Sequence, residues 1–167
     1  MTDIFNIKGV AIHSGVSRNG IMYTAEELQK ATKSLKNVPL QKDHDSSIDK
    51  SVGLVTKSNF DEKEEHITYQ GWAKEDGTNL IEKIKDGRVK AVSVGGLVER
   101  MVKESEDSDV LIAKGLQFVE LSLVSVPGVP GATVQQALKM HASAKTAKEK
   151  SNIPAICEDV SKFIRLE

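Results

Sequence analysis

Three reactive side chains lie far apart in the chain, each in or beside an apolar run that favours β-structure. They are His44, Ser93 and Glu120. Together they provide a base, a nucleophile and an acid that can orient the base, which are the groups that acyl-transfer hydrolysis requires. Their order along the chain, histidine then serine then acid, differs from the order in most familiar serine hydrolases.

His44 is flanked by Asp43 and Asp45. Imidazole is the side chain best suited to move a proton near neutral pH, which supports the role of base. The same residues are compatible with a surface histidine in an acidic loop. They are also compatible with a metal site that would add Glu120, although no second histidine follows at the three- or four-residue spacing that places two ligands on one helix face.

Ser93 precedes the pair Gly95-Gly96 in an apolar run. Glycines there would remove side-chain bulk and let a substrate backbone approach the hydroxyl. The motif lacks the glycines on both sides of the serine that define a nucleophile elbow, and a serine on the polar side of a half-buried strand would look the same. Ser122 and Ser125 are rival nucleophiles without adjacent glycines.

Glu120 interrupts the apolar run over residues 116–126. Strand alternation places it on one face with Ser122 and Val124, where it is either an exterior charge or the partner of an imidazole. The run ends in Pro-Gly-Val-Pro-Gly, a rigid turn. We expect the backbone N–H of Gly128 or Val129 to be available to an oxyanion there.

The pattern predicts a mostly β fold with flanking helices, arranged as a closed or nearly closed barrel. Strands are predicted over 4–13, 52–59, 66–73, 89–101 with a break at Gly95-Gly96, 110–113 and 116–126. Helices are predicted from an N-cap at Thr24 with Glu27 as its capping-box partner, over 78–85, and in the tail over 132–150 and 153–166. The strands are not separated by the regular helices that a parallel α/β sheet needs.

Composition narrows the class of protein. The 167 residues carry 23 basic and 24 acidic side chains, so no charge excess favours nucleic acid or an anionic membrane. The single cysteine excludes an intrachain disulfide, and no apolar run reaches the roughly 18–20 residues of a membrane span. The N-terminus lacks the basic and apolar regions of a signal peptide. His13, His66 and His141 have no comparable surroundings and are expected to be structural or exposed.

Several stretches in series resemble the prohead (capsid maturation) proteases of tailed viruses, which are related in fold to the herpesvirus assemblins. These stretches are Asn19 to Leu28, Pro39 to His44 and on to Val52-Gly53, Val89 to Gly96, and Val119 to Ala132. The resemblance covers about residues 5–135. It implies a protease barrel over 1–135 and leaves 136–167 as a helical tail that docks scaffold or is self-cleaved.

The resemblance also assigns roles. His44 matches the catalytic histidine, Ser93 the nucleophile, and Glu120 the third member, where the herpesvirus relatives have a second histidine. Gly95 and Gly96 match small residues after the serine. The implied reaction is cleavage of internal scaffold and of the N-terminal extension of the major capsid protein, without a cofactor or metal, inside a procapsid assembling in the host cytoplasm. The herpesvirus relatives dimerise, so a homodimer is also an expectation.

Two other functions stay open at this stage. The barrel could be a non-enzymatic structural or scaffold module of a virus-like particle, in which case the three residues would not converge. A metal-dependent hydrolase using His44, Asp43, Asp45 and Glu120 would be sensitive to chelators.

Overall fold

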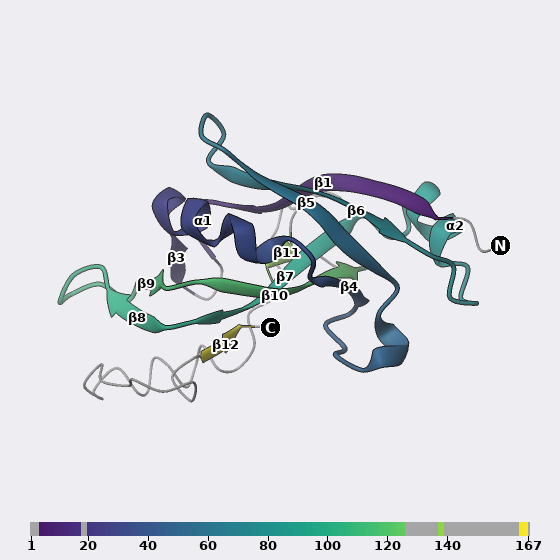
Figure 1. The fold of residues 1–167 in the computed structure, drawn as a ribbon. Coiled ribbons are helices and arrows are strands. Elements are labelled where there is room, and N and C mark those ends of the chain that lie inside the picture. The colour runs from purple at the N-terminus through teal and green to yellow at the C-terminus, as the bar shows by residue number, and fades with distance from the viewer. Residues whose placement is uncertain (1–3, 18–19, 126–136, 139–163, 167) are drawn as a thin grey trace.

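The computed structural model describes residues 4–17, 20–125, 137–138 and 164–166. These residues form a mostly β fold with short helices (Figure 1). In chain order the elements are β1 (Phe5–His13), β2 (Gly15–Val16), β3 (Ile21–Tyr23), α1 (Ala25–Ala31), the 3₁₀ turn η1 (Thr32–Leu35), β4 (Pro39–Lys42), η2 (Ile48–Lys50), β5 (Gly53–Asp61), β6 (His66–Ala73), α2 (Leu80–Lys85), β7 (Ala91–Val98), β8 (Arg100–Lys103), β9 (Leu111–Lys114), β10 (Gln117–Val124), β11 (Ala137–Leu138) and β12 (Ile164–Leu166).

Two sheets organise these strands. The larger has the order β1-β6-β5-β4-β10-β7-β11, with β12 also paired to β7, and the smaller has the order β2-β3-β9-β8. In Figure 1 the strands β1, β5 and β6 cross above β7 and β10, so the larger sheet curves around the core as a half-barrel. The parallel pair β4–β10 and the antiparallel pair β10–β7 lie side by side in it.

The prediction of a mostly β fold with flanking helices is confirmed, but the expected closed barrel is wrong. Closure requires the two end strands of a sheet to pair with each other. Within the described residues β1 pairs only with β6, and the edge of β7 pairs with β11 and β12 instead. The edge of β7 that barrel closure would need is therefore occupied by two short strands from the C-terminal part of the chain.

Helix α1 begins as its sequence predicts. Thr24 has extended backbone angles and its side chain accepts a hydrogen bond from the Glu27 N–H. The Glu27 carboxylate does not complete a capping box with Thr24 but accepts from the Gly115 N–H at 3.0 Å, which ties the helix to the turn before β10. Leu28 and its neighbours Ala31 and Leu35 form the buried stripe that the helical spacing predicts.

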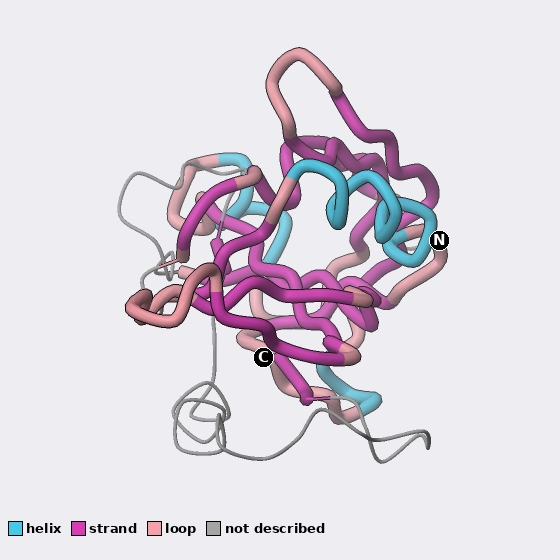
Figure 2. Tube along the Cα trace, turned by 90° about the vertical axis from the view of Figure 1, so that its left-hand side faces the viewer, coloured by secondary structure: helices cyan, strands magenta, loops and turns pink. Residues whose placement is uncertain are grey.

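The turn η1 joins two strands of the larger sheet on the side of β4. The Ser58 hydroxyl of β5 donates to the Thr32 carbonyl, and the Phe118 N–H of β10 donates to the Ser34 hydroxyl. Figure 2 shows the helical segment α1–η1 lying beside the curved strands. These bonds attach the turn to β5 and to the first residues of β10.

Most other predicted elements are confirmed, including α2 within 78–85 and the strands β1, β5, β6, β9 and β10. The predicted break at Gly95-Gly96 is wrong, because β7 continues through both glycines and the irregularity lies in β10. In the tail, residues 137–138 and 164–166 form strands where helices were predicted. The rest of the tail and the 135/136 boundary lie outside the described residues. No helix in the described part of the chain is both long and apolar enough to cross a membrane.

Candidate active site

The pairing of β10 with β7 brings two of the predicted residues to one face. Ser122 lies directly opposite Ser93, and Glu120 lies directly opposite Gly95. Directly paired residues project from the same face of a sheet, so Ser93, Ser122 and Glu120 share a face. Ser93 and Ser122 are 0% exposed and Glu120 is 4% exposed, which places all three inside the protein.

A β-bulge prepares this arrangement. The register shifts between Phe118 and Glu120, which face Gly96 and Gly95 respectively. An extra residue in one strand lets side chains two positions apart point to opposite faces. Phe118 therefore packs in the main apolar core, while Glu120 points to the other face of the strand.

His44 reaches the same place through the turn that ends β4. The Asp43 N–H donates to the Leu123 carbonyl and extends the parallel ladder by one bond. Asp43 and His44 then take left-handed backbone angles, with φ of 53° and 57°. Aspartate and histidine are among the residue types that tolerate this region. The double left-handed step turns the chain away from the sheet and carries the imidazole toward β10.

The imidazole meets the carboxylate of Glu120. His44 Nδ1 lies 2.5 Å from Glu120 Oε1, and the two side chains are 2% and 6% exposed. Because Glu120 is buried, the alternative of an exterior charge at this position is wrong. A buried charge is tolerated when it is paired, as it is here with His44. The alternative that His44 is a surface histidine is also wrong, because its side chain is buried.

Ser122 binds both partners. Its hydroxyl donates to Glu120 Oε2 at 2.5 Å and accepts from the His44 backbone N–H at 3.1 Å. The sequence suggested only a rival nucleophile here. The signal that could have identified this role is the alternation that puts Ser122 two residues after Glu120 on the same face.

Gly95 makes room for the carboxylate. A Cβ atom at this position would lie 2.7 Å from Glu120 Cδ, closer than real contacts allow. A Cβ at Gly96 would lie 2.9 Å from the Gln117 carbonyl oxygen. Both glycines thus have a packing reason in the structure, and their predicted role in substrate approach stays a prediction.

A cleft of about 420 Å³ lies beside the histidine turn, lined in part by Asp43, Asp45 and Val124. Lys42 also lines it and pairs with Asp76. Partial burial alone would raise the pKa of Asp76, but hydrogen bonds from Lys42 and Thr78 outweigh burial and lower that pKa to about 2. The lysine at this wall therefore has a permanently charged partner at neutral pH.

Gly128 and Val129 lie outside the described residues, so their role as oxyanion donors stays a prediction. In the described ranges no three histidine, cysteine or acidic side chains group closely enough to hold a metal ion, so the alternative site of His44 with Asp43, Asp45 and Glu120 does not form.

The comparison with known protein families identifies a serine protease. A model of the caudovirus prohead serine proteases matches residues 15–149, and the chain belongs to this family. The fold is similar to that of the bacteriophage T4 capsid assembly protease gp21, with a TM-score of 0.55 and 16% identity over 73% of this chain and 82% of that one. No curated protein sequence has significant similarity to the chain. Membership of a protease family removes the non-enzymatic module from consideration.

Proposed function

We propose that this protease cleaves the major capsid protein and the internal scaffold of an assembling procapsid, with Ser93 as nucleophile, His44 as base and Glu120 as the residue that orients His44. The contact of 2.5 Å between His44 Nδ1 and Glu120 Oε1, on the face that carries Ser93, is the observation that supports this assignment most strongly. This cleavage takes place inside the procapsid in the host cytoplasm. A homodimer stays a prediction.

The proposed chemistry follows from the orientation of the imidazole. An ionised carboxylate only accepts hydrogen bonds, so Nδ1 carries the proton and the lone pair is on Nε2. Nε2 takes the Ser93 proton as Oγ attacks the scissile carbonyl, and the imidazolium then protonates the leaving amine. The same nitrogen then deprotonates a water molecule that attacks the acyl carbonyl, and the imidazolium protonates Ser93 Oγ as the bond to the acyl group breaks. Glu120 stabilises the imidazolium throughout both steps.

Backbone N–H groups must stabilise the oxyanion that forms in each step. One such donor contributes roughly 3–4 kcal/mol in other acyl transferases. Gly128 and Val129 are our candidates on the sequence evidence of a rigid turn directly after β10. The cleft beside Asp43 and Asp45 is the proposed position of substrate side chains next to the scissile bond.

Co-expression with the neighbouring coat and scaffold proteins tests the function. We expect the wild type to trim them at defined sites, seen by intact-mass spectrometry, and Ser93→Ala to leave them whole. Ser34→Ala, which removes a hydroxyl bonded to β10 away from the site, is the control and should still trim. Uncut proteins with folded wild type, or trimming by Ser93→Ala, would contradict the proposal.

A further inference from the structure

We propose that Ser122 is a positioning residue that fixes both the carboxylate of Glu120 and the backbone of His44 in the geometry that the reaction needs. Its catalytic consequence depends on the proposed function, but its effect on the histidine does not. The hydroxyl donates to Glu120 Oε2 at 2.5 Å and accepts from the His44 N–H at 3.1 Å. One side chain therefore restrains two members of the proposed triad.

The first restraint acts on the carboxylate. Glu120 has three rotatable side-chain bonds, and one hydrogen bond through Oε1 would leave its carboxylate plane free to swing about the last of them. The Ser122 hydroxyl engages Oε2, so each oxygen has its own partner. Hydrogen bonds to a charged group are the stronger kind, and this one is shielded from water because Ser122 is 0% exposed.

The second restraint acts on the backbone. Left-handed conformation is unfavourable for residues other than glycine, and Asp43 and His44 adopt it in succession. Such a step persists only when the surroundings hold it. The Asp43 N–H is held by the Leu123 carbonyl, and the His44 N–H, one residue beyond the ladder, is held by the Ser122 hydroxyl. The position of the imidazole therefore depends on Ser122.

The register shows why this position takes a serine. Ser122 lies directly opposite Ser93 in a fully buried pair. A small hydroxyl fits there and satisfies two polar groups at once. Alanine would leave the His44 N–H and Glu120 Oε2 without these bonds in a buried site, where an unmade hydrogen bond is costly. Threonine keeps the hydroxyl and adds one methyl group.

The test compares Ser122→Ala, Ser122→Thr and the control Ser34→Ala. We expect Ser122→Ala to lower kcat for a peptide spanning the trimmed capsid site by about tenfold to a hundredfold, the scale of a small misplacement of a reacting group, with KM within about twofold. Ser122→Thr should recover most of kcat. A kcat for Ser122→Ala equal to that of Ser34→Ala would overturn the proposal.

A measurement that needs no catalysis separates the two proposals. In the Ser93→Ala background, NMR should show that Ser122→Ala speeds hydrogen exchange of the His44 amide and shifts its Nδ1 proton upfield, while Ser34→Ala changes neither. Unchanged His44 signals would overturn the positioning role even if the wild type cleaves. Changed His44 signals, together with a wild type that cleaves neither the coat nor the scaffold protein, would support the positioning role of Ser122. They would at the same time contradict the proposed substrates. If Ser122→Ala does not fold, Ser122→Cys, of similar size and a weak hydrogen-bonding group, replaces it with the same expectations.

Discussion

Two regions of the molecule hold a histidine in or beside a strand pair, and they treat it differently. At the end of β4 the ring of His44 faces the carboxylate of Glu120. At the start of β6 the ring of His66 meets the ring of His13 edge to face, with centroids 4.7 Å apart, and its buried Nδ1 has no hydrogen-bond partner among the residues described. The carboxylate next to it in sequence, Glu65, instead accepts from the Ser14 hydroxyl.

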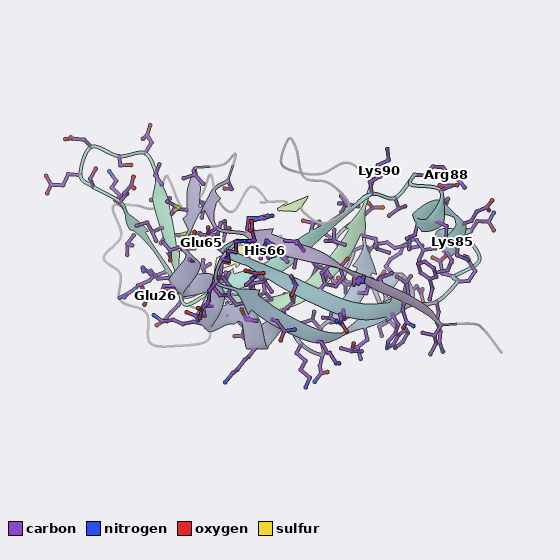
Figure 3. The ribbon with its side chains drawn as sticks, turned by 90° about the horizontal axis from the view of Figure 1, so that it is seen from above. Glu26, Glu65, His66, Lys85, Arg88 and Lys90 are labelled. Carbon is purple, nitrogen blue, oxygen red and sulfur yellow. The ribbon has the colours of Figure 1, made fainter. Side chains whose placement is uncertain are left out.

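Figure 3 shows Glu65 and His66 toward the part of the molecule that carries Glu26 of α1, away from the cluster of Lys85, Arg88 and Lys90 near α2. The two regions share burial and strand pairing, so neither feature makes a histidine a base. The difference is a carboxylate placed at Nδ1 of His44, which is the arrangement that the proposed base requires. Among the described residues, the region around β10 supplies this carboxylate to His44, whereas the Nδ1 of His66 has no hydrogen-bond partner.

The largest expected effect comes from exchanging the two histidines for glutamine in turn. His44→Gln should lower kcat/KM by about 10⁴-fold or more, because it removes the proposed base. His66→Gln should stay within about twofold of wild type, an effect that surface or structural positions commonly show. Peptide-cleavage kinetics with both purified variants, each checked by circular dichroism, decides this. Equal losses in the two variants would remove the distinction between the regions.

The next effect comes from the carboxylate. Glu120→Gln removes the charge that stabilises the imidazolium in the proposed mechanism, and we expect kcat to fall by about 10²–10⁴-fold. The control is Glu27→Gln, a second buried glutamate that accepts from the Gly115 N–H. This control should lower the melting temperature but leave kcat near wild type. A Glu120→Gln enzyme at the wild-type rate would show that Glu120 has no part in the reaction.

A smaller effect is expected from crowding the carboxylate without removing it. Gly95→Ala places a methyl group within 2.7 Å of Glu120 Cδ, and overpacking of this kind costs about 1–3 kcal/mol of unfolding free energy. In a Glu120→Ala background the space is vacant, so the same substitution should cost much less. Chemical denaturation of the four proteins of this cycle measures the coupling. Equal costs in both backgrounds would mean that Gly95 does not serve to accommodate Glu120.

Many of the elements around the candidate site could be predicted from the local sequence. The rest depend on contacts between segments that are distant in the chain. The strands and the N-cap at Thr24 follow from alternation and capping chemistry within a few residues. The bulge before Glu120 and the left-handed step at Asp43 are set by pairing between strands that are distant in sequence, so periodicity does not reveal them. The same holds for the edge of β7, where segments of the tail occupy the place that barrel closure would need.

The smallest effect belongs to the second histidine region and concerns pH. Burial, and then the neighbouring His66, lower the pKa of His13, although Glu64 acts in the opposite sense. The unfolded chain therefore binds more protons than the fold between the lowered pKa and the ordinary value of about 6.5. This contribution to stability is complete above that value and is lost as pH falls through the pKa in the fold.

Because His13 is largely exposed, solvent screening keeps the effect small, and we expect His13→Gln to reduce the acid-induced fall in melting temperature by no more than about 2 °C. Scanning calorimetry of wild type and variant at pH 7.5 and pH 5.5 measures it. A fall that is steeper in the variant than in the wild type would show that His13 stabilises the fold in its charged form. The contrast between the two histidine regions would then be wrong.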